Sequence, residues 1–158
     1  MAKHDAVIVW KSDGNFASGK YSRAHEWRFD GGAVVRGSSS PHVVPIPQSD
    51  AAGVDPEEAL IASAASCHML WFLDLARRAG FEVESYRDDA EGVLGKDDRG
   101  RIALTRIRLR PDIAFAGRPP TADELAELHH EAHEKCFIAN SLRSEIVVEA
   151  RDQAEAAE

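Results

Sequence analysis

Residues 55–80 read DPEEALIASAASCHMLWFLDLARRAG, and the fold is predicted most directly from this segment. Asp55 offers an N-cap acceptor, a proline occupies the first helical position, and two acids follow where they face the positive end of the helix dipole. The pattern predicts a helix that runs to Arg78 and ends at Gly80. Over its middle the side chains are apolar or small on almost every side, which is typical of a helix enclosed by other elements. We expect this helix at the centre of the fold.

The residues before the helix alternate in the manner of strands, with one run over 6–10 and a second over 20–29. In the second run, period two places one set of side chains on a common face, namely Tyr21, Arg23, His25, Trp27 and Phe29. We expect this face to point inward because three of its members are aromatic. A buried Arg23 then needs a partner for its charge. Residues 37–54 are rich in Ser, Pro and Gly and predict an irregular connection.

The residues after the helix predict a hairpin, a second helix and a last strand. Strands over 81–94 and 101–110 flank a turn, and the apolar phase shifts between Leu104 and Ile107, which indicates a bulge. Thr121, with an acid three residues on, starts a helix that reaches Cys136. A strand over 145–150 ends a single domain over 1–150, and we expect the polar tail 151–158 to be disordered. The fold class is therefore α+β.

Composition excludes several classes of function. The 158 residues carry a formal charge of −8 and no long basic cluster, which argues against a nucleic-acid partner. The N-terminus shows no apolar signal region, so we expect a cytoplasmic protein. The longest uncharged run, 59–73, is shorter than the roughly 20 residues that cross a bilayer, so we expect no membrane partner.

The two cysteines, Cys67 and Cys136, are the candidate reactive groups. A cysteine in a helix is most often a small buried hydrophobe. Here the pair is accompanied by an inward Arg23 and by acids at Glu57 and Glu58. A cation can hold a thiolate in an apolar site, and a thiolate attacks peroxide oxygen and then condenses with a second thiol. This chemistry needs no cofactor.

Three motifs together resemble the OsmC/Ohr family of thiol peroxidases: DPEE at 55–58, ASAASC at 62–67, and EKC at 134–136 before a final strand. The resemblance covers nearly the whole chain. It implies an intertwined α+β homodimer with N-terminal strands, a buried central helix, a β-hairpin, a second helix and a final strand. It also implies reduction of organic hydroperoxides by a reactive and a resolving cysteine, with a dithiol reductant as the electron donor.

Carried over by position, the resemblance implies that Cys67 is the reactive cysteine, Cys136 the resolving one and Glu57 the site glutamate. The family arginine matches Arg23 in one branch and Arg36 in another, and the inward face of the second strand favours Arg23. The chain differs from familiar members at His68, at Phe137, and over 40–45, which includes His42. We expect His68, Arg36 and His42 to be auxiliary at most, and His25 to rank with them.

Geometry on the helix favours a dimer. Ten helical residues separate Glu57 from Cys67 by roughly 15 Å, so the two side chains cannot touch within one helix. A second chain must bring Glu57 to the site unless Arg23 spans the gap. We expect apolar walls that suit alkyl hydroperoxides better than hydrogen peroxide, from Trp71, Phe72, Phe137 and Ile138.

Two other interpretations stay open. A hydrophobic-ligand-binding module would use the same pocket and bury both cysteines without chemistry. A zinc protein would use His129, His133 and Cys136, which share one helical face at spacings of four and three. The segment HEAH at 130–133 lacks the two-residue gap of a zinc-protease motif, and we expect no metal.

Overall fold

The computed structural model describes residues 2–149, and the chain divides into two compact units with the boundary between Ala59 and Leu60. Each unit is described by itself. The single domain over 1–150 stays a prediction, and the tail over 151–158 lies outside the described residues.

The first unit is built on a three-stranded antiparallel sheet in the order β1 (Ala6–Val9), β2 (His25–Phe29) and β3 (Val34–Gly37). The sequence did not predict β3. His25 and Trp27 are half-buried on one face as expected, whereas Phe29 is exposed, so the inward placement of Phe29 is wrong. The connection over 38–53 is irregular, as predicted, and it returns to the sheet through a hydrogen bond from the Ser38 amide to the Val54 carbonyl.

Helix α1 (Pro56–Arg78) has the bounds that its capping residues predict. The Asp55 carboxylate accepts a hydrogen bond from the Glu58 amide at 2.8 Å, and the Asp55 amide donates to the Glu58 carboxylate at 3.0 Å. This reciprocal pair is a capping box. At the other end Gly80 adopts a left-handed φ of 83°, and the Phe81 amide donates to the Ala76 carbonyl at 2.9 Å, which ends the helix.

Within the described chain α1 is buried on one face only, so the expected enclosure on every side is not seen in a single chain. One face is buried through Ala64, His68, Phe72, Leu75 and Ala76, whereas Leu70 is 61% exposed. By length and composition α1 is also apolar enough to cross a membrane, a test that core helices pass too. The uncharged run over 59–73 is shorter than α1, so a judgement based on that run alone underestimates the apolar length of the helix.

The predicted hairpin is present, but each arm consists of two strands. β4 (Glu82–Asp88) pairs with β7 (Pro111–Ala116), and β5 (Glu91–Lys96) pairs with β6 (Ile102–Leu109), both antiparallel. The single strand over 81–94 is therefore two strands, and β7 was not predicted. The expected bulge is confirmed, because Val93 faces Arg106 and Leu94 faces Leu104, which leaves Thr105 as an extra residue.

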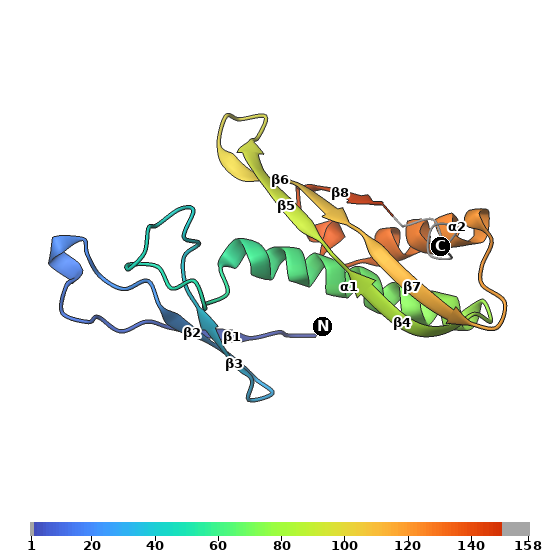
Figure 1. Cartoon of the computed structure of the whole chain (residues 1–158), viewed down its shortest axis with the longest axis horizontal. Coiled ribbons are helices and arrows are strands. Elements are labelled where there is room, and N and C mark those ends of the chain that lie inside the picture. Colours follow the sequence, from blue (N-terminus) through green and yellow to red (C-terminus); the bar gives the residue numbers. More distant parts are fainter. Residues whose placement is uncertain (1, 150–158) are drawn as a thin grey trace, which may run out of the picture. The chain divides into compact units, whose positions relative to one another are not determined.

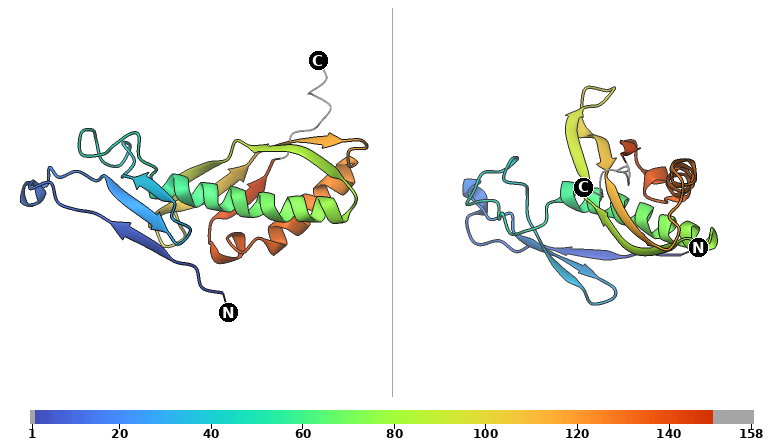
Figure 2. Two further views of the ribbon diagram at one scale, coloured as in Figure 1. Left: turned by 90° about the horizontal axis from the view of Figure 1, so that it is seen from below. Right: turned by 45° about the vertical axis from the view of Figure 1, so that its right-hand side comes forward.

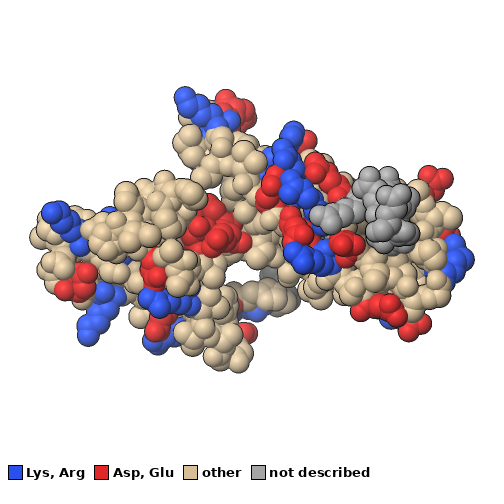
Figure 3. All heavy atoms as spheres, viewed as in Figure 1, with Lys and Arg blue, Asp and Glu red and all other residues tan. Residues whose placement is uncertain are grey.

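Helix α2 (Ala122–Lys135) starts at Thr121 with the predicted capping box. The chain then returns through β8 (Glu145–Val148), which runs parallel to β6 at the edge of the sheet β5-β6-β8. In Figures 1 and 2, α2 and the pair β4–β7 both lie along the C-terminal half of α1. The outer surface of the sheet alternates basic and acidic side chains (Figure 3), including the ion pairs Arg106–Glu145 and Arg108–Glu91.

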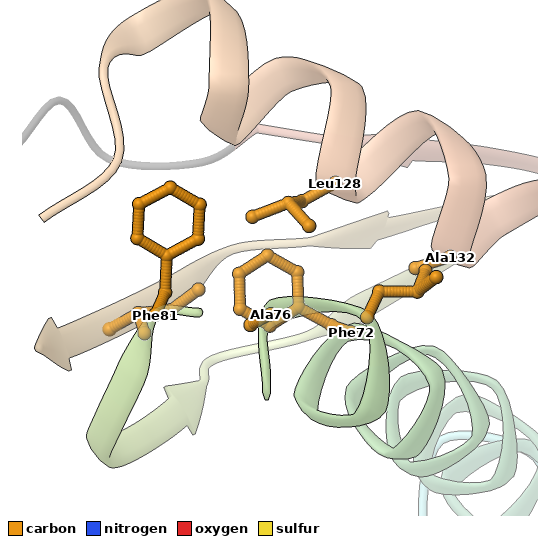
Figure 4. Close-up of a cluster of buried hydrophobic side chains, with 7 residues drawn as sticks. Phe72, Ala76, Phe81, Leu128 and Ala132 are labelled. Atoms are coloured by element: carbon orange, nitrogen blue, oxygen red, sulfur yellow. The ribbon is translucent and has the colours of Figure 1, made fainter. Parts of the chain in front are cut away.

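Two buried clusters hold α1 in the second unit. In the first, Phe72 and Ala76 of α1 meet Phe81, Leu128 and Ala132 (Figure 4). In the second, Ala64 of α1 lies against Ile107 and Leu109 of β6. Both clusters contact the buried face of α1, one before Cys67 along the helix and one after it.

Candidate active site

The second unit brings the two cysteines together. Cys67 lies in the middle of α1, and Cys136 is the C-cap residue of α2. Both are free thiols, and Cys67 is close enough to Cys136 to contribute to the raised pKa of Cys136. Cys136 is only 1% exposed, whereas Cys67 is half-buried. The expected meeting of two sulfurs from distant parts of the sequence is therefore observed.

The surroundings of Cys136 favour its protonated form. Burial, which acts most strongly, and the hydrogen bond with Cys67 together raise the pKa of Cys136 to about 11. The backbone amides of Ala139 and Ile138 act in the opposite direction, and the Ala139 amide donates to the Cys136 sulfur at 3.3 Å. At neutral pH Cys136 is a thiol, and Cys67 is the more accessible of the pair.

Aromatic side chains flank the pair on each helix. The rings of Trp71, one turn after Cys67, and Phe137, next to Cys136, meet edge to face with centroids 5.7 Å apart. The Lys135 ammonium lies 5.9 Å from the Trp71 ring centroid. Phe137 is 70% exposed and can contact a bound molecule.

Two of the four predicted pocket residues face the core instead. Phe72 is fully buried in the cluster of Figure 4, and Ile138 packs against the cluster of Ala64, Ile107 and Leu109. The prediction that Phe72 lines an open pocket is wrong, because its position on α1 points it at α2 rather than at the surface.

His68 bonds to a second histidine rather than to Cys67. Its Nε2 lies 3.0 Å from Nδ1 of His129, and the two ring planes are within 9° of parallel with centroids 5.3 Å apart, so the rings meet edge to edge. The pKa of each histidine is lowered to about 4, by burial for His129 and by burial together with the nearby His129 and His133 for His68. Sequence reasoning missed this pair, since His68 and His129 belong to different helices.

The zinc site is not formed. No group of three ligating side chains that could hold a metal ion occurs within residues 2–149. His129 is engaged with His68, and Cys136 lies against Cys67 and two backbone amides. The zinc interpretation is therefore wrong, because shared spacing on one helix did not bring His129 and Cys136 to a common point.

The two candidate arginines lie in the first unit and differ in their partners. Arg36 forms an ion pair with Asp50. The Arg23 guanidinium lies 3.5 Å from the Tyr21 ring centroid and donates to the Tyr21 carbonyl at 2.5 Å. No carboxylate pairs with Arg23 within residues 2–149. Because Arg23 belongs to the first unit and Cys67 to the second, the placement of Arg23 at the thiol stays a prediction.

The remaining predicted residues are also in the first unit. Glu58 forms the capping box, whereas the side chain of the half-buried Glu57 has no hydrogen bond or ion pair within residues 2–149. His25 accepts a hydrogen bond at Nε2 from the Trp27 indole at 2.6 Å, so its side chain stabilises the arrangement of side chains on β2. His42 is exposed in the irregular connection.

Together, the fold and the paired thiols define an α+β protein with a dithiol centre between two helices. A family model described as OsmC-like protein matches residues 48–151. The chain belongs to this OsmC-like protein family, which confirms the resemblance seen in the sequence.

Solved structures support the same assignment. An OsmC-like protein of unknown function from Vibrio cholerae O1 biovar eltor is 49% identical, with a TM-score of 0.93 over 96% of this chain and 100% of that chain. An organic hydroperoxide resistance protein from Elizabethkingia anophelis is 17% identical, with a TM-score of 0.68 over 95% of this chain and 94% of that one. At that identity the likeness shows the fold alone.

Among curated proteins, the uncharacterized protein YmaD of Bacillus subtilis is 24% identical over 97 residues. The match covers 60% of this chain and 63% of YmaD, so the chain spans less than two thirds of that relative.

Proposed function

We propose that this protein is a thiol peroxidase that reduces organic hydroperoxides to alcohols, with Cys67 as the first nucleophile and Cys136 as the resolving thiol. The observation that carries the proposal is the meeting of the two thiols between α1 and α2. Membership in a family whose fold is shared by an organic hydroperoxide resistance protein supports it.

In the first step the Cys67 thiolate attacks the terminal oxygen of R–O–O–H. An S–O bond forms as the O–O bond breaks, the alkoxide takes a proton to become the alcohol, and Cys67 is oxidised by two electrons to a sulfenic acid. The high pKa of Cys136 makes it a poor first nucleophile, which supports the order of events.

In the second step Cys136 attacks the Cys67 sulfur. The S–S bond forms, the S–O bond breaks, and water leaves with the Cys136 proton. The amides of Ile138 and Ala139 stabilise negative charge on the Cys136 sulfur as it loses that proton. A dithiol reductant then restores both thiols by exchange.

The remaining parts of the proposal come from the family resemblance. Arg23 stabilises the Cys67 thiolate and Glu57 orients that arginine, in a cytoplasmic homodimer. The separation of Glu57 and Cys67 on one continuous helix supports the dimer, since ten residues correspond to about 15 Å. Trp71 and Phe137 contact the alkyl group of the substrate.

Mass measurement during titration with cumene hydroperoxide tests the proposal. We expect a loss of two hydrogens per chain in the wild type, no reaction in Cys67→Ser, and a single sulfenic acid in Cys136→Ser that a dimedone probe traps. Steady-state peroxide consumption by Cys67→Ser equal to that of the wild type would falsify the mechanism. A native Cys67 that reacts with iodoacetamide no faster than a model thiol, with no bridge to Cys136, would favour a ligand-binding module.

A further inference from the structure

The buried histidine pair joins the two helices that carry the cysteines. His68 follows Cys67 on α1, and His129 lies on α2 two turns before Cys136. The pair is 1% and 5% exposed, and Phe72 stacks on His129 with ring centroids 4.5 Å apart. The histidines therefore lie buried where α1 meets α2, in contact with the apolar cluster of Phe72.

The hydrogen bond between His68 and His129 depends on direction, whereas the neighbouring apolar contacts between α1 and α2 do not. The adjoining contacts between α1 and α2 are made by Phe72, Ala76, Leu128 and Ala132, which are apolar. Apolar surfaces tolerate small sliding movements, because the hydrophobic effect is not directional. A buried N–H···N bond at 3.0 Å is lost when its angle or length changes, so it selects one register of the helices.

The surroundings keep the pair neutral. The titratable neighbours are His133 on α2, which acts on His68, and Tyr86 on β4, whose ring lies 5.7 Å from Phe72 and which is itself close to Asp88. No carboxylate is hydrogen-bonded to either imidazole in the described chain, and His68 Nδ1 and His129 Nε2 are buried without a protein partner there. One imidazole N–H therefore donates to the lone pair of the other ring.

We propose that His68 and His129 are positioning residues that set the register of α1 against α2 and so hold the Cys67 and Cys136 thiols within bonding distance. Neither histidine touches the substrate in this role. The inference rests on the proposed function only for its effect on turnover, since the pairing of the thiols can be measured without peroxide.

The two histidines offer matched substitutions because each uses a known ring nitrogen. Gln places an amide near the Nε2 position and Asn near the Nδ1 position. His68→Gln and His129→Asn therefore retain a polar atom where the bond is made, whereas His68→Asn and His129→Gln place it at the other ring position. The double variant His68→Leu/His129→Leu replaces both polar partners by apolar groups and avoids an unpaired buried donor.

The experiment measures the equilibrium between the Cys67–Cys136 disulfide and mixtures of reduced and oxidised glutathione, by mass. We expect His68→Gln and His129→Asn to stay within about threefold of the wild-type equilibrium constant. His68→Asn, His129→Gln and the double Leu variant should form the disulfide about fivefold to tenfold less readily. Urea unfolding identifies the variants that are folded.

Two results would overturn the positioning role. One is a folded double Leu variant that forms the disulfide as readily as the wild type, since packing alone would then suffice. The other is a folded His68→Gln variant that bridges as poorly as His68→Asn. If the wild type forms the disulfide with glutathione but consumes no hydroperoxide, the proposed function fails while the positioning role stands.

Discussion

Trp71 and Phe137 meet edge to face at 86°, one beside each cysteine of the pair. The contact joins α1 to the segment after α2 at the surface, since Phe137 is mostly exposed. An aromatic edge of this kind offers apolar surface to which an alkyl group can bind.

We predict that Phe137→Ala lowers kcat/KM for cumene hydroperoxide by about fivefold to tenfold, because about 50 Å² of apolar contact is lost at about 25 cal/mol per Å². For hydrogen peroxide, which has no alkyl group, kcat/KM should be unchanged. Peroxide-consumption assays on both substrates check this. Ile102→Ala, at an exposed apolar residue of β6, is the control. Equal losses on both substrates would show that Phe137 does not contact the alkyl group.

The pKa of Cys136 gives a second prediction. Burial raises it most, and the hydrogen bond with Cys67 raises it further, to about 11. In Cys67→Ala the hydrogen bond is absent, so the pKa of Cys136 should fall below the wild-type value but stay above that of an exposed thiol. Titration of the thiolate absorbance near 240 nm measures this. An unchanged Cys136 titration would mean that the two thiols do not interact in solution.

The histidine pair predicts a dependence of stability on pH. A histidine in the unfolded chain has a pKa near 6.5, whereas His68 and His129 have pKa values of about 4 in the fold. Between these values the unfolded chain binds more protons, so the free energy of unfolding decreases as pH falls from 6.5 to 4 and is unaffected above that range. The limit is about 3 kcal/mol for each histidine.

Urea denaturation at about pH 7 and about pH 4.5 measures the effect. Other groups also titrate in this range, so the comparison is with the double variant His68→Gln/His129→Asn, which should lose less stability on acidification than the wild type. Identical losses in the two proteins would show that the histidines bind protons in the fold as easily as in the unfolded chain.

Substitutions of the two acids at the start of α1, Glu57 and Glu58, should affect different properties: one activity, the other stability. Glu58 closes the capping box with Asp55, so Glu58→Ala should lower the free energy of unfolding by about 0.5–1 kcal/mol. Glu57→Ala should leave stability nearly unchanged and lower kcat/KM, if Glu57 orients the site arginine. Thermal unfolding and peroxide assays on both variants test this pair. Full activity in Glu57→Ala would reduce Glu57 to an acid that complements the helix dipole.

The helices could be predicted closely because their limits are set by local chemistry. Asp55 and Gly80 bound α1, and Thr121 starts α2, each through hydrogen bonds or backbone conformations within a few residues. Strands β3 and β7 were missed because a strand depends on a partner elsewhere in the chain. Pro111 also argued against a strand at this position, because proline cannot donate a backbone hydrogen bond, although it is accepted at the first residue of a strand.

In the site, too, local sequence motifs could be read, whereas a contact between two distant residues could not be predicted. The cysteine pair was predicted through motifs at 62–67 and 134–136, whose spacing resembles a known family. The bond between His68 and His129 joins residues 61 positions apart, and neither position has a local pattern that names its partner. The zinc interpretation failed for the same reason, since helical spacing describes one face of α2 and says nothing about what α1 brings to it.

The two candidate arginines, Arg23 and Arg36, differ in whether a carboxylate balances their charge. The charge of Arg36 is balanced by Asp50, whereas Arg23 lies over Tyr21 and donates to a backbone carbonyl, which leaves its charge available to a thiolate. If Arg23 lies beside Cys67 as proposed, Arg23→Ala should lower the rate constant of Cys67 with cumene hydroperoxide by at least about tenfold, because an adjacent cation shifts a pKa by one unit or more.

Arg36→Ala is the matched control, and it should leave that rate constant within about twofold, since the charge of Arg36 is already balanced by Asp50. Stopped-flow measurement of the first step across pH separates the effect on the Cys67 pKa from an effect on substrate binding. If Arg36→Ala rather than Arg23→Ala slows the first step, the activating cation comes from β3 instead of from the segment before β2. Arg23 would then serve only to hold the turn around Tyr21.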